Sequence, residues 1–436
     1  MIWKVFFSTG MLAICMVFTG CGCTSKGSAN KPDSGRDGAL DSGDTGIEAS
    51  VEDAGLEAST QDAQPGSDCT ASVLPSEEIL PGELFRLPHP AESFFDSSDW
   101  NGRQVAYSES RCPYPDARRR DVYMFDLDTM QEMEVATKIS SQRSVTVNVD
   151  SIVYVDLSYN DPDIPGYEYR IELIHYDIPT GQETRLTDSN WGKYMPKYNG
   201  THVAYLSWEW NPQDVGGPAD LVLRDLGTDQ KQMLADHTQN IQRCYDISED
   251  YVTWQAVPIE EPGVWDIFYH HLPSGITHRL NKSTEYLFCP DVSGEKLSWS
   301  QATSGSWDVY VLDLVTSVEE QVTAEQHDQV LHQIAGNLLL WFDYRHSGGS
   351  FPGTSYDTYL HDLETGVSRR LTAESRYWGV LWPSCQWLVY MEVYDSESVR
   401  LFAWDLVVAG VLDASCHVIP CDPQTEQCAM IEWRGL

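Results

Sequence analysis

The chain has 436 residues, and its 66 acidic residues against 28 basic ones give a formal net charge of −38 at pH 7. A surface this acidic argues against binding to nucleic acid or to anionic lipid headgroups, because both are polyanions. The length that remains after an N-terminal segment of low complexity is enough for one large domain with a substantial core.

The first twenty residues have the composition of an export signal. Lys4 is the only positive charge, and the apolar stretch from Val5 to Phe18 is shorter than the roughly 20 residues that a transmembrane helix needs. Small residues precede Cys21, and this arrangement resembles the lipobox of bacterial lipoproteins. The resemblance implies that Cys21 is lipidated and that residues 1–20 are a lipoprotein signal peptide.

Two alternatives stay open at this segment. Cys23 offers a second lipidation site, and an ordinary secretory signal could end nearby. Gly22 follows the candidate cysteine and, by resemblance to the sorting rule of Gram-negative lipoproteins, implies the outer membrane, with either face possible. The predicted location is the cell envelope, with the chain anchored to the membrane rather than spanning it.

Residues 21–82 are predicted to form a disordered acidic tether. From Thr24 to Asp68 the composition is Ser, Gly, Ala, Asp and Glu without an aromatic residue. Such a segment cannot bury enough apolar surface to offset its chain entropy. Because a charged linker repels itself and extends, it would hold the folded part clear of the lipid surface.

Seven copies of one pattern follow. Each copy has an aromatic residue that closes an apolar triplet, at a period of roughly 40–50 residues, and the seven residues are Tyr107, Tyr154, Tyr205, Trp254, Trp299, Trp341 and Tyr390. An alternating apolar run follows each one and ends in Asp-Leu or a close relative. This period with strand-like composition predicts an all-β fold, a seven-bladed β-propeller of four-stranded antiparallel blades. The repeated Asp is interpreted as a cap of its own turn.

The repeats resemble those of TolB-type propellers. Asp177-Ile-Pro-Thr-Gly and Asp362-Leu-Glu-Thr-Gly are each followed by a short strand that ends in Arg-Leu-Thr, as in that family, although the Ser-Pro-Asp core of the family's hairpin is absent. A glycine precedes the aromatic residue where a tight hairpin wants a positive φ, at Gly102, Gly200, Gly294 and Gly336. The resemblance implies the architecture and says little about partners.

The ring is expected to close through the N-terminus. No outer strand follows Asp405 in register, but Leu84–Pro88 offers one at the matching distance before the first aromatic marker. This N-terminal strand would complete the last blade and leave no free sheet edge. The predicted organisation is a signal peptide at 1–20, a tether at 21–82, a propeller at 83–410 and a cysteine-bearing tail at 411–436.

Cysteine usage favours disulfides in an oxidising compartment. Cys421 and Cys428 bracket a short loop and are the predicted local pair. Cys244 and Cys289 occupy the same position in neighbouring repeats and could be bridged, although equivalent strands of adjacent blades can lie too far apart for a disulfide. A zinc site is disfavoured because no Cys-x-x-Cys occurs, and no cofactor is predicted.

Few residues stand outside the repeat pattern as candidates for a site. Asp246 and Asp291 hold equivalent positions on innermost strands of adjacent blades. They would either line the central channel, where they could hold a cation or a basic peptide, or cap hairpin turns. His332 also lies on a predicted innermost strand and could face the channel or be structural. His270 and His271 are neighbours in a strand and so point to opposite faces.

No catalytic constellation is evident, because the chain has no Gly-x-Ser-x-Gly elbow, phosphate loop or dinucleotide fingerprint. The predicted function is that of a non-enzymatic, monomeric envelope lipoprotein whose propeller binds a protein or envelope component. One alternative is a lyase or glycan-active enzyme with a site at the channel mouth, since some lyases of pectin fragments use such a fold with a histidine-bound metal. Another is a carbohydrate-binding module that uses loop aromatics such as Trp208, Trp210 and Tyr344.

Overall fold

The computed structural model describes the chain in segments between residues 77 and 420. These are residues 77–80, 84–87, 94–111, 120–138, 141–157, 171–188, 192–208, 219–239, 241, 244–257, 264–280, 286–303, 305–346, 351, 356–372, 381–393 and 399–420. Apart from one 3-10 turn at His237–Gln239, the regular structure in these segments is β-strand. No helix among them is long and apolar enough to cross a membrane.

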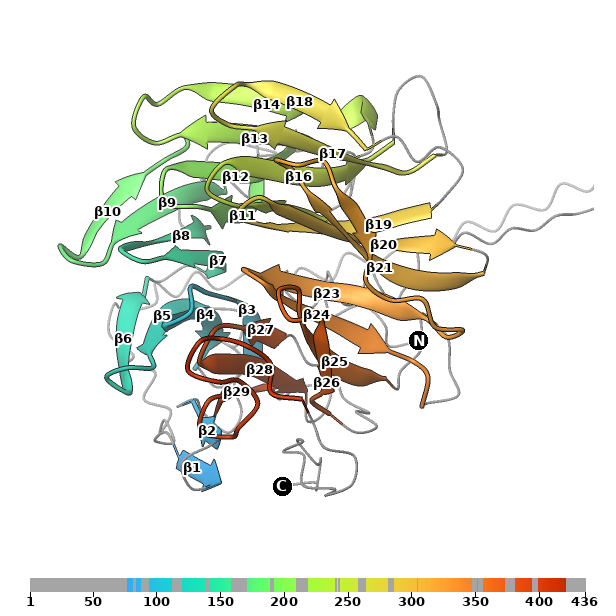
Figure 1. The fold of residues 1–436 in the computed structure, drawn as a ribbon. Coiled ribbons are helices and arrows are strands. Elements are labelled where there is room, and N and C mark those ends of the chain that lie inside the picture. Colours follow the sequence, from blue (N-terminus) through green and yellow to red (C-terminus); the bar gives the residue numbers. More distant parts are fainter. Residues whose placement is uncertain are drawn as a thin grey trace, which may run out of the picture.

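The strands form seven antiparallel sheets that are arranged as the blades of a propeller (Figure 1). Blade 1 is β3 (Phe94–Trp100), β4 (Gln104–Ser110), β5 (Asp121–Asp126) and β6 (Gln131–Ala136). Blade 2 is β7 (Gln142–Asn148), β8 (Ser151–Asp156), β9 (Glu172–Asp177) and β10 (Gln182–Arg185). Blade 3 is β11 (Gly192–Tyr198), β12 (His202–Trp208), β13 (Asp220–Asp225) and β14 (Lys231–Ala235).

The next three blades repeat this order. Blade 4 is β15 (Tyr245–Ile247), β16 (Tyr251–Ala256), β17 (Asp266–His271) and β18 (Ile276–Arg279). Blade 5 is β19 (Tyr286–Ser293), β20 (Lys296–Thr303), β21 (Ser306–Asp313) and β22 (Glu319–Gln321). Blade 6 is β23 (Gln329–Ala335), β24 (Leu338–Asp343), β25 (Asp357–Asp362) and β26 (Val367–Arg370).

Blade 7 joins the two ends of the chain, as predicted. Its strands β27 (Leu381–Pro383), β28 (Trp387–Val393) and β29 (Val399–Asp405) come from the C-terminal repeat. Strand β2 (Leu84–Arg86) pairs with β29 and completes the blade (Figure 1). A fifth strand, β1 (Glu77–Leu80), pairs with β2. Ordered structure therefore begins inside segment 21–82, where composition predicted none, because an apolar Ile-Leu pair follows two glutamates there and can join the sheet.

The repeated residues have the structural roles that their positions predicted. The seven aromatic markers are at most 3 % exposed, and several stack on an aromatic residue of the next strand, as Trp299 does on Tyr310. Each Asp at the end of a third strand accepts hydrogen bonds from N–H groups two or three residues later, as Asp313 does from Val315 and Thr316. The four hairpin glycines all have positive φ.

Two disulfides form among the described residues. Cys244 and Cys289 are bridged, with 4.9 Å between their Cα atoms. Equivalent strands of adjacent blades can lie too far apart for a disulfide. These two cysteines are close because both lie at the innermost strands, where neighbouring blades converge. The second disulfide, Cys385–Cys416, was not predicted. Cys21, Cys421 and Cys428 lie outside the described residues.

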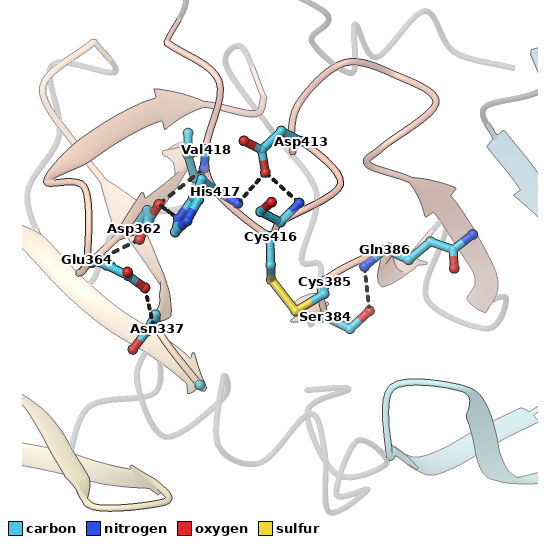
Figure 2. Close-up of a disulfide and its surroundings, with 12 residues drawn as sticks. Asn337, Asp362, Glu364, Ser384, Cys385, Gln386, Asp413, Cys416, His417 and Val418 are labelled. Carbon is cyan, nitrogen blue, oxygen red and sulfur yellow. Dashed lines mark hydrogen bonds and ion pairs between the residues drawn. A yellow bond between two sulfur atoms is a disulfide. The ribbon is translucent and has the colours of Figure 1, made fainter.

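The chain after β29 folds back over blades 6 and 7 (Figure 2). Cys416 is bonded to Cys385 in the hairpin between β27 and β28. The neighbouring His417 ring contacts the Asp362 carboxylate of blade 6, with 3.0 Å between Nδ1 and Oδ2. Val411, Leu412 and Val418 are buried in the core that these two blades share. We call residues 411–420 the C-terminal latch, since they join two blades next to the point of ring closure.

Candidate functional site

One position on the innermost strands brings the candidate carboxylates together. In each blade this residue pairs with the residue just before the aromatic marker of the second strand. Going round the ring, the position is occupied by Asp99, Thr146, Lys197, Asp246, Asp291, Gln333 and Trp382. We call these residues the central ring. The structure therefore places Asp246 and Asp291 at the centre of the propeller and adds Lys197 and Asp99 to them.

Lys197 is the cation of this group. Its Nζ lies 3.4 Å from Oδ1 of Asp246 in the next blade. Its side chain is 41 % exposed and that of Asp246 is 19 % exposed, so solvent reaches the centre. A hydrogen bond joins the carboxyl groups of Asp246 and Asp291. Lys197, Asp246 and Asp291 thus form a continuous row across blades 3, 4 and 5.

The aspartates of the ring also tie each blade to the next. Asp99 accepts a hydrogen bond from the N–H of Val147 at 3.0 Å. In the same way Asp291 accepts one from the N–H of Ile334 at 2.7 Å, and Asp246 accepts a longer one from Val292 at 3.4 Å. The alternative interpretation, that these aspartates cap hairpin turns, is therefore wrong. The carboxylate oxygens of these aspartates face backbone N–H groups at the edge of the neighbouring innermost strand.

The surroundings of the carboxyl pair shift the pKa of Asp291 and of the nearby Lys197. Burial raises the pKa of Asp291 well above 3.8, and the adjacent charge of Asp246 raises it further. Burial also lowers the pKa of Lys197, but the nearby aspartates outweigh this effect and raise it. Lys197 therefore stays charged, and Asp291 is a carboxyl whose pKa burial and the neighbouring carboxylate raise. Two close carboxyl groups that share one proton are typical of acid–base sites.

His332 lies near this ring but in another environment. It is the bulged residue of β23, between the paired residues Leu331 and Gln333. Its ring stacks on Phe342, with 4.8 Å between the ring centroids. Among the described residues, no group of three His, Cys, Asp or Glu side chains is placed to hold a metal ion.

The remaining candidate residues that the structure describes have structural roles. His270 is 1 % exposed and bonds to Thr277, whereas His271 is partly exposed and bonds to Ser274. The two rings do not share a site, as strand alternation predicted. Tyr344, expected to be a loop aromatic available for a sugar, is fully buried. Trp210 and the side chain of Trp208 lie outside the described structure.

Lys197 and Asp99 were missed, although a signal for them existed. Both precede their aromatic markers by the same spacing as Asp246 and Asp291. A search for acidic pairs alone passes over Lys197, because its residue type differs from theirs. A comparison of all seven repeats at that one column would have found the whole ring.

Comparisons with known proteins identify the fold. No family model and no curated protein sequence matches the chain. An oligogalacturonate lyase in complex with manganese matches with a TM-score of 0.52 and 14 % identity, over 79 % of this chain and 99 % of that one. The β-propeller domain of the Trilobed protease from Pyrococcus furiosus matches with a TM-score of 0.52 and 13 % identity, over 72 % and 94 %.

The chain spans about half of the length of a peptidase that it matches. An acylaminoacyl peptidase from Pyrococcus horikoshii has a TM-score of 0.52 and 12 % identity over 72 % of this chain, which spans 51 % of the peptidase. At these identities the comparisons establish the β-propeller fold alone. They nevertheless contradict the prediction of a non-enzymatic scaffold, because the matching structures are enzymes or enzyme domains.

Proposed function

We propose that this protein is a lyase that acts on oligosaccharides of uronic acids, with Lys197, Asp246 and Asp291 as its reacting groups. The observation that carries the proposal is the carboxyl pair at the centre of the ring. Burial and the adjacent carboxylate raise the pKa of Asp291 well above its ordinary value, and Asp246 lies between it and the Lys197 ammonium group. An acid, a base and a cation are the three groups that β-elimination next to a substrate carboxylate requires.

The separation of the two carboxyl groups favours elimination over glycoside hydrolysis. Hydrolases that use two carboxyl groups hold them roughly 5–9.5 Å apart, because the glycosidic bond or a water molecule lies between them. Asp246 and Asp291 are joined by a direct hydrogen bond and leave no such space. An elimination needs both groups on neighbouring atoms of one sugar, which a close pair can reach.

The proposed reaction uses each of the three side chains once. The Asp246 carboxylate takes the proton from the carbon next to the substrate carboxylate. The electron pair of that C–H bond forms a C=C bond, the C–O bond to the neighbouring sugar breaks, and the leaving oxygen takes the proton of Asp291. Lys197 stabilises the negative charge that grows on the substrate carboxylate. The hydrogen bond between the aspartates then returns the proton from Asp246 to Asp291.

The extent of the structural matches supports this class over a peptidase. The lyase aligns over almost its whole length, whereas the peptidase aligns over about half of its own. The lyase structure contains manganese, whereas the described residues of this chain include no group of three His, Cys, Asp or Glu side chains that could hold a metal ion. No step of the proposed reaction passes through a metal.

We propose that the enzyme is an outer-membrane lipoprotein, lipidated at Cys21 and carried on the 21–82 segment. Two disulfides, Cys244–Cys289 and Cys385–Cys416, support an oxidising compartment. We also propose that the repeats are of the TolB type. In support, Thr187 and Thr372, which close the Arg-Leu-Thr strand ends, each accept a hydrogen bond from the N–H of a third strand.

The test is an elimination assay on the purified full chain. Trigalacturonate is the substrate, and the ultraviolet absorbance of the unsaturated product is followed over time. We expect Asp291→Asn to lower kcat by about 10²–10⁴-fold, the usual contribution of a general acid. Asn can still accept the hydrogen bond from Ile334, so the fold should persist. Asp313→Asn, which removes a carboxylate from an ordinary turn, is the matched control.

The outcome separates three possibilities. A rise in absorbance that depends on Asp291 supports the proposal. New reducing ends without that absorbance would mean hydrolysis and would refute elimination. No turnover of trigalacturonate, or turnover that Asp291→Asn leaves unchanged, would also refute the proposal.

A further inference from the structure

Three aromatic side chains lie outside the repeat pattern, where β19 and β21 begin. They are Phe288 in β19, Trp307 in β21 and Phe351 from the connection between β24 and β25. We call them the rim cluster. Unlike the seven buried aromatic markers, all three are partly exposed. Trp307 and Phe351 pack against the core that blades 6 and 7 share, and the part of each ring that this packing leaves open to solvent is available to a ligand.

The rings of the rim cluster contact one another at steep angles. Phe288 and Trp307 have centroids 5.9 Å apart at 67°, and Phe351 lies 5.8 Å from each of them. Asp328, which is 7 % exposed, fixes two of the three. Its carboxylate accepts hydrogen bonds from the N–H of Trp307 at 2.9 Å and of Phe351 at 2.7 Å. The cluster is therefore held in place before any ligand arrives.

A buried amide lies at the start of β23, the innermost strand of blade 6. Gln329 is fully buried, and neither Nε2 nor Oε1 has a hydrogen-bond partner among the described residues. Its counterpart in blade 2, Gln142, donates to Asp156. In blade 6 the equivalent carboxylate, Asp343, is instead bound to Arg345. A buried amide without a partner costs free energy, so a ligand group is a reason to retain it.

Strand alternation turns this amide toward the rim cluster. Gln329 lies on the same side of β23 as Leu331, which belongs to the buried cluster between blades 5 and 6 that also contains Val309. On blade 5, Phe288 pairs with Ser300, whose hydroxyl accepts a hydrogen bond from the N–H of Leu331. Phe288 and Gln329 thus face the same space between blades 5 and 6, at the end where both strands begin.

We propose that the rim cluster and Gln329 form a binding subsite for one sugar ring of the substrate. The apolar C–H face of the sugar packs on the aromatic rings, and the amide bonds to its hydroxyl groups. Phe288 is three residues from Asp291 on β19, with a bulge between them, so the two lie at most roughly 10 Å apart along the strand. The subsite therefore holds a ring away from the bond that is cleaved. This inference rests on the proposed function for its ligand class.

The test measures binding apart from turnover. Titration calorimetry with trigalacturonate is carried out on full-length Asp291→Asn protein, in which elimination is suppressed. We expect Trp307→Leu and Gln329→Met each to raise Kd by about tenfold, the effect of losing one good contact. Because Gln329→Met also removes an amide that lacks a partner, its Tm should stay the same or rise.

The matched control is Gln142→Met in the same background. That amide has a partner within its own blade, so its loss should lower Tm and leave Kd unchanged. If Gln329→Met lowers Tm and leaves Kd unchanged, the amide is structural and the subsite is refuted. Absence of measurable binding refutes it as well. Binding that depends on Trp307 and Gln329 in a protein without elimination activity would support the subsite and refute the lyase.

Discussion

The contact between Asp362 and His417 allows a sharp test of the C-terminal latch. Asp362 caps its own turn through Glu364 and Thr365, and it also accepts hydrogen bonds from Nδ1 of His417 and the N–H of Val418 (Figure 2). Burial alone would raise the pKa of Asp362, but these hydrogen bonds outweigh it and lower it to about 2. Asp362→Asn removes the charge and keeps the shape.

The expected magnitude follows from this pKa. The shift from 3.8 to about 2 corresponds to about 2 kcal/mol of stability, at about 1.4 kcal/mol per pKa unit. The Asp362 side chain is fully buried, so solvent screening reduces this little. For a cooperative unit of roughly 330 residues, the entropy of unfolding converts the loss into a fall in Tm of about 3 °C.

The pH dependence has two sides. The pKa of Asp362 is depressed, so its contribution is complete above 3.8 and is lost as the pH falls toward 2. The hydrogen bond to Asp362 raises the pKa of His417 above 6.5. The contribution of His417 is therefore complete below 6.5 and is lost as the pH rises through its folded pKa. The latch should stabilise the protein most between about pH 4 and pH 6.5.

Calorimetric unfolding of the wild type and Asp362→Asn across this pH range measures the effect. Asp313→Asn is the control, because Asp313 makes the same turn contacts in blade 5 without a contact to the latch. Its pKa is lowered by those turn hydrogen bonds, so only the acid side of the profile should change. Identical profiles for the two variants would refute the reasoning, since the histidine contact would then contribute nothing.

Three further predictions concern the ring closure and the proposed reaction. Replacing Cys385 and Cys416 together by serine opens a loop with a sequence separation of 31. Because the unfolded chain then gains freedom, the free energy of unfolding should fall by about 3.7 kcal/mol. Denaturant unfolding that finds no change would contradict this. Lys197→Met should lower kcat of the elimination by at least about 100-fold, and stopped assays on trigalacturonate that show wild-type rates would contradict its role. Added salt should raise kcat/KM, because a chain of net charge −38 repels an anionic substrate until that repulsion is screened; a fall in kcat/KM would contradict this.

Much of the fold was readable from the sequence because the blade is a local unit. Its strands are consecutive, and its turns use Gly and Asp for reasons that act within a few residues. The spacing of the aromatic markers therefore predicted the seven blades, and Leu84–Pro88 was recognised as the strand that closes the ring. Strand β1 was missed, because four residues in an acidic segment carry too little signal to outweigh the composition around them.

The candidate site was only partly readable. Asp246 and Asp291 were found because two acidic residues repeat at one spacing. Which groups they contact depends on the angle between neighbouring blades, and this angle comes from packing between residues far apart in sequence. The hairpin-cap interpretation failed for that reason, whereas Lys197 was overlooked because its residue type differs from that of the acidic pair.

The sequence by itself determined the number of blades, the roles of the repeated aromatic and Asp residues, and the contribution of the N-terminus to the last blade. Each of these follows from local hydrogen bonding and from the period of the apolar pattern. Only the tertiary structure decided that Lys197 meets Asp246, that Cys385 bonds to Cys416, and that Gln329 is left without a partner beside Phe288. These contacts form where equivalent strands converge at the centre or where the chain end returns to the ring, and no local pattern encodes that convergence.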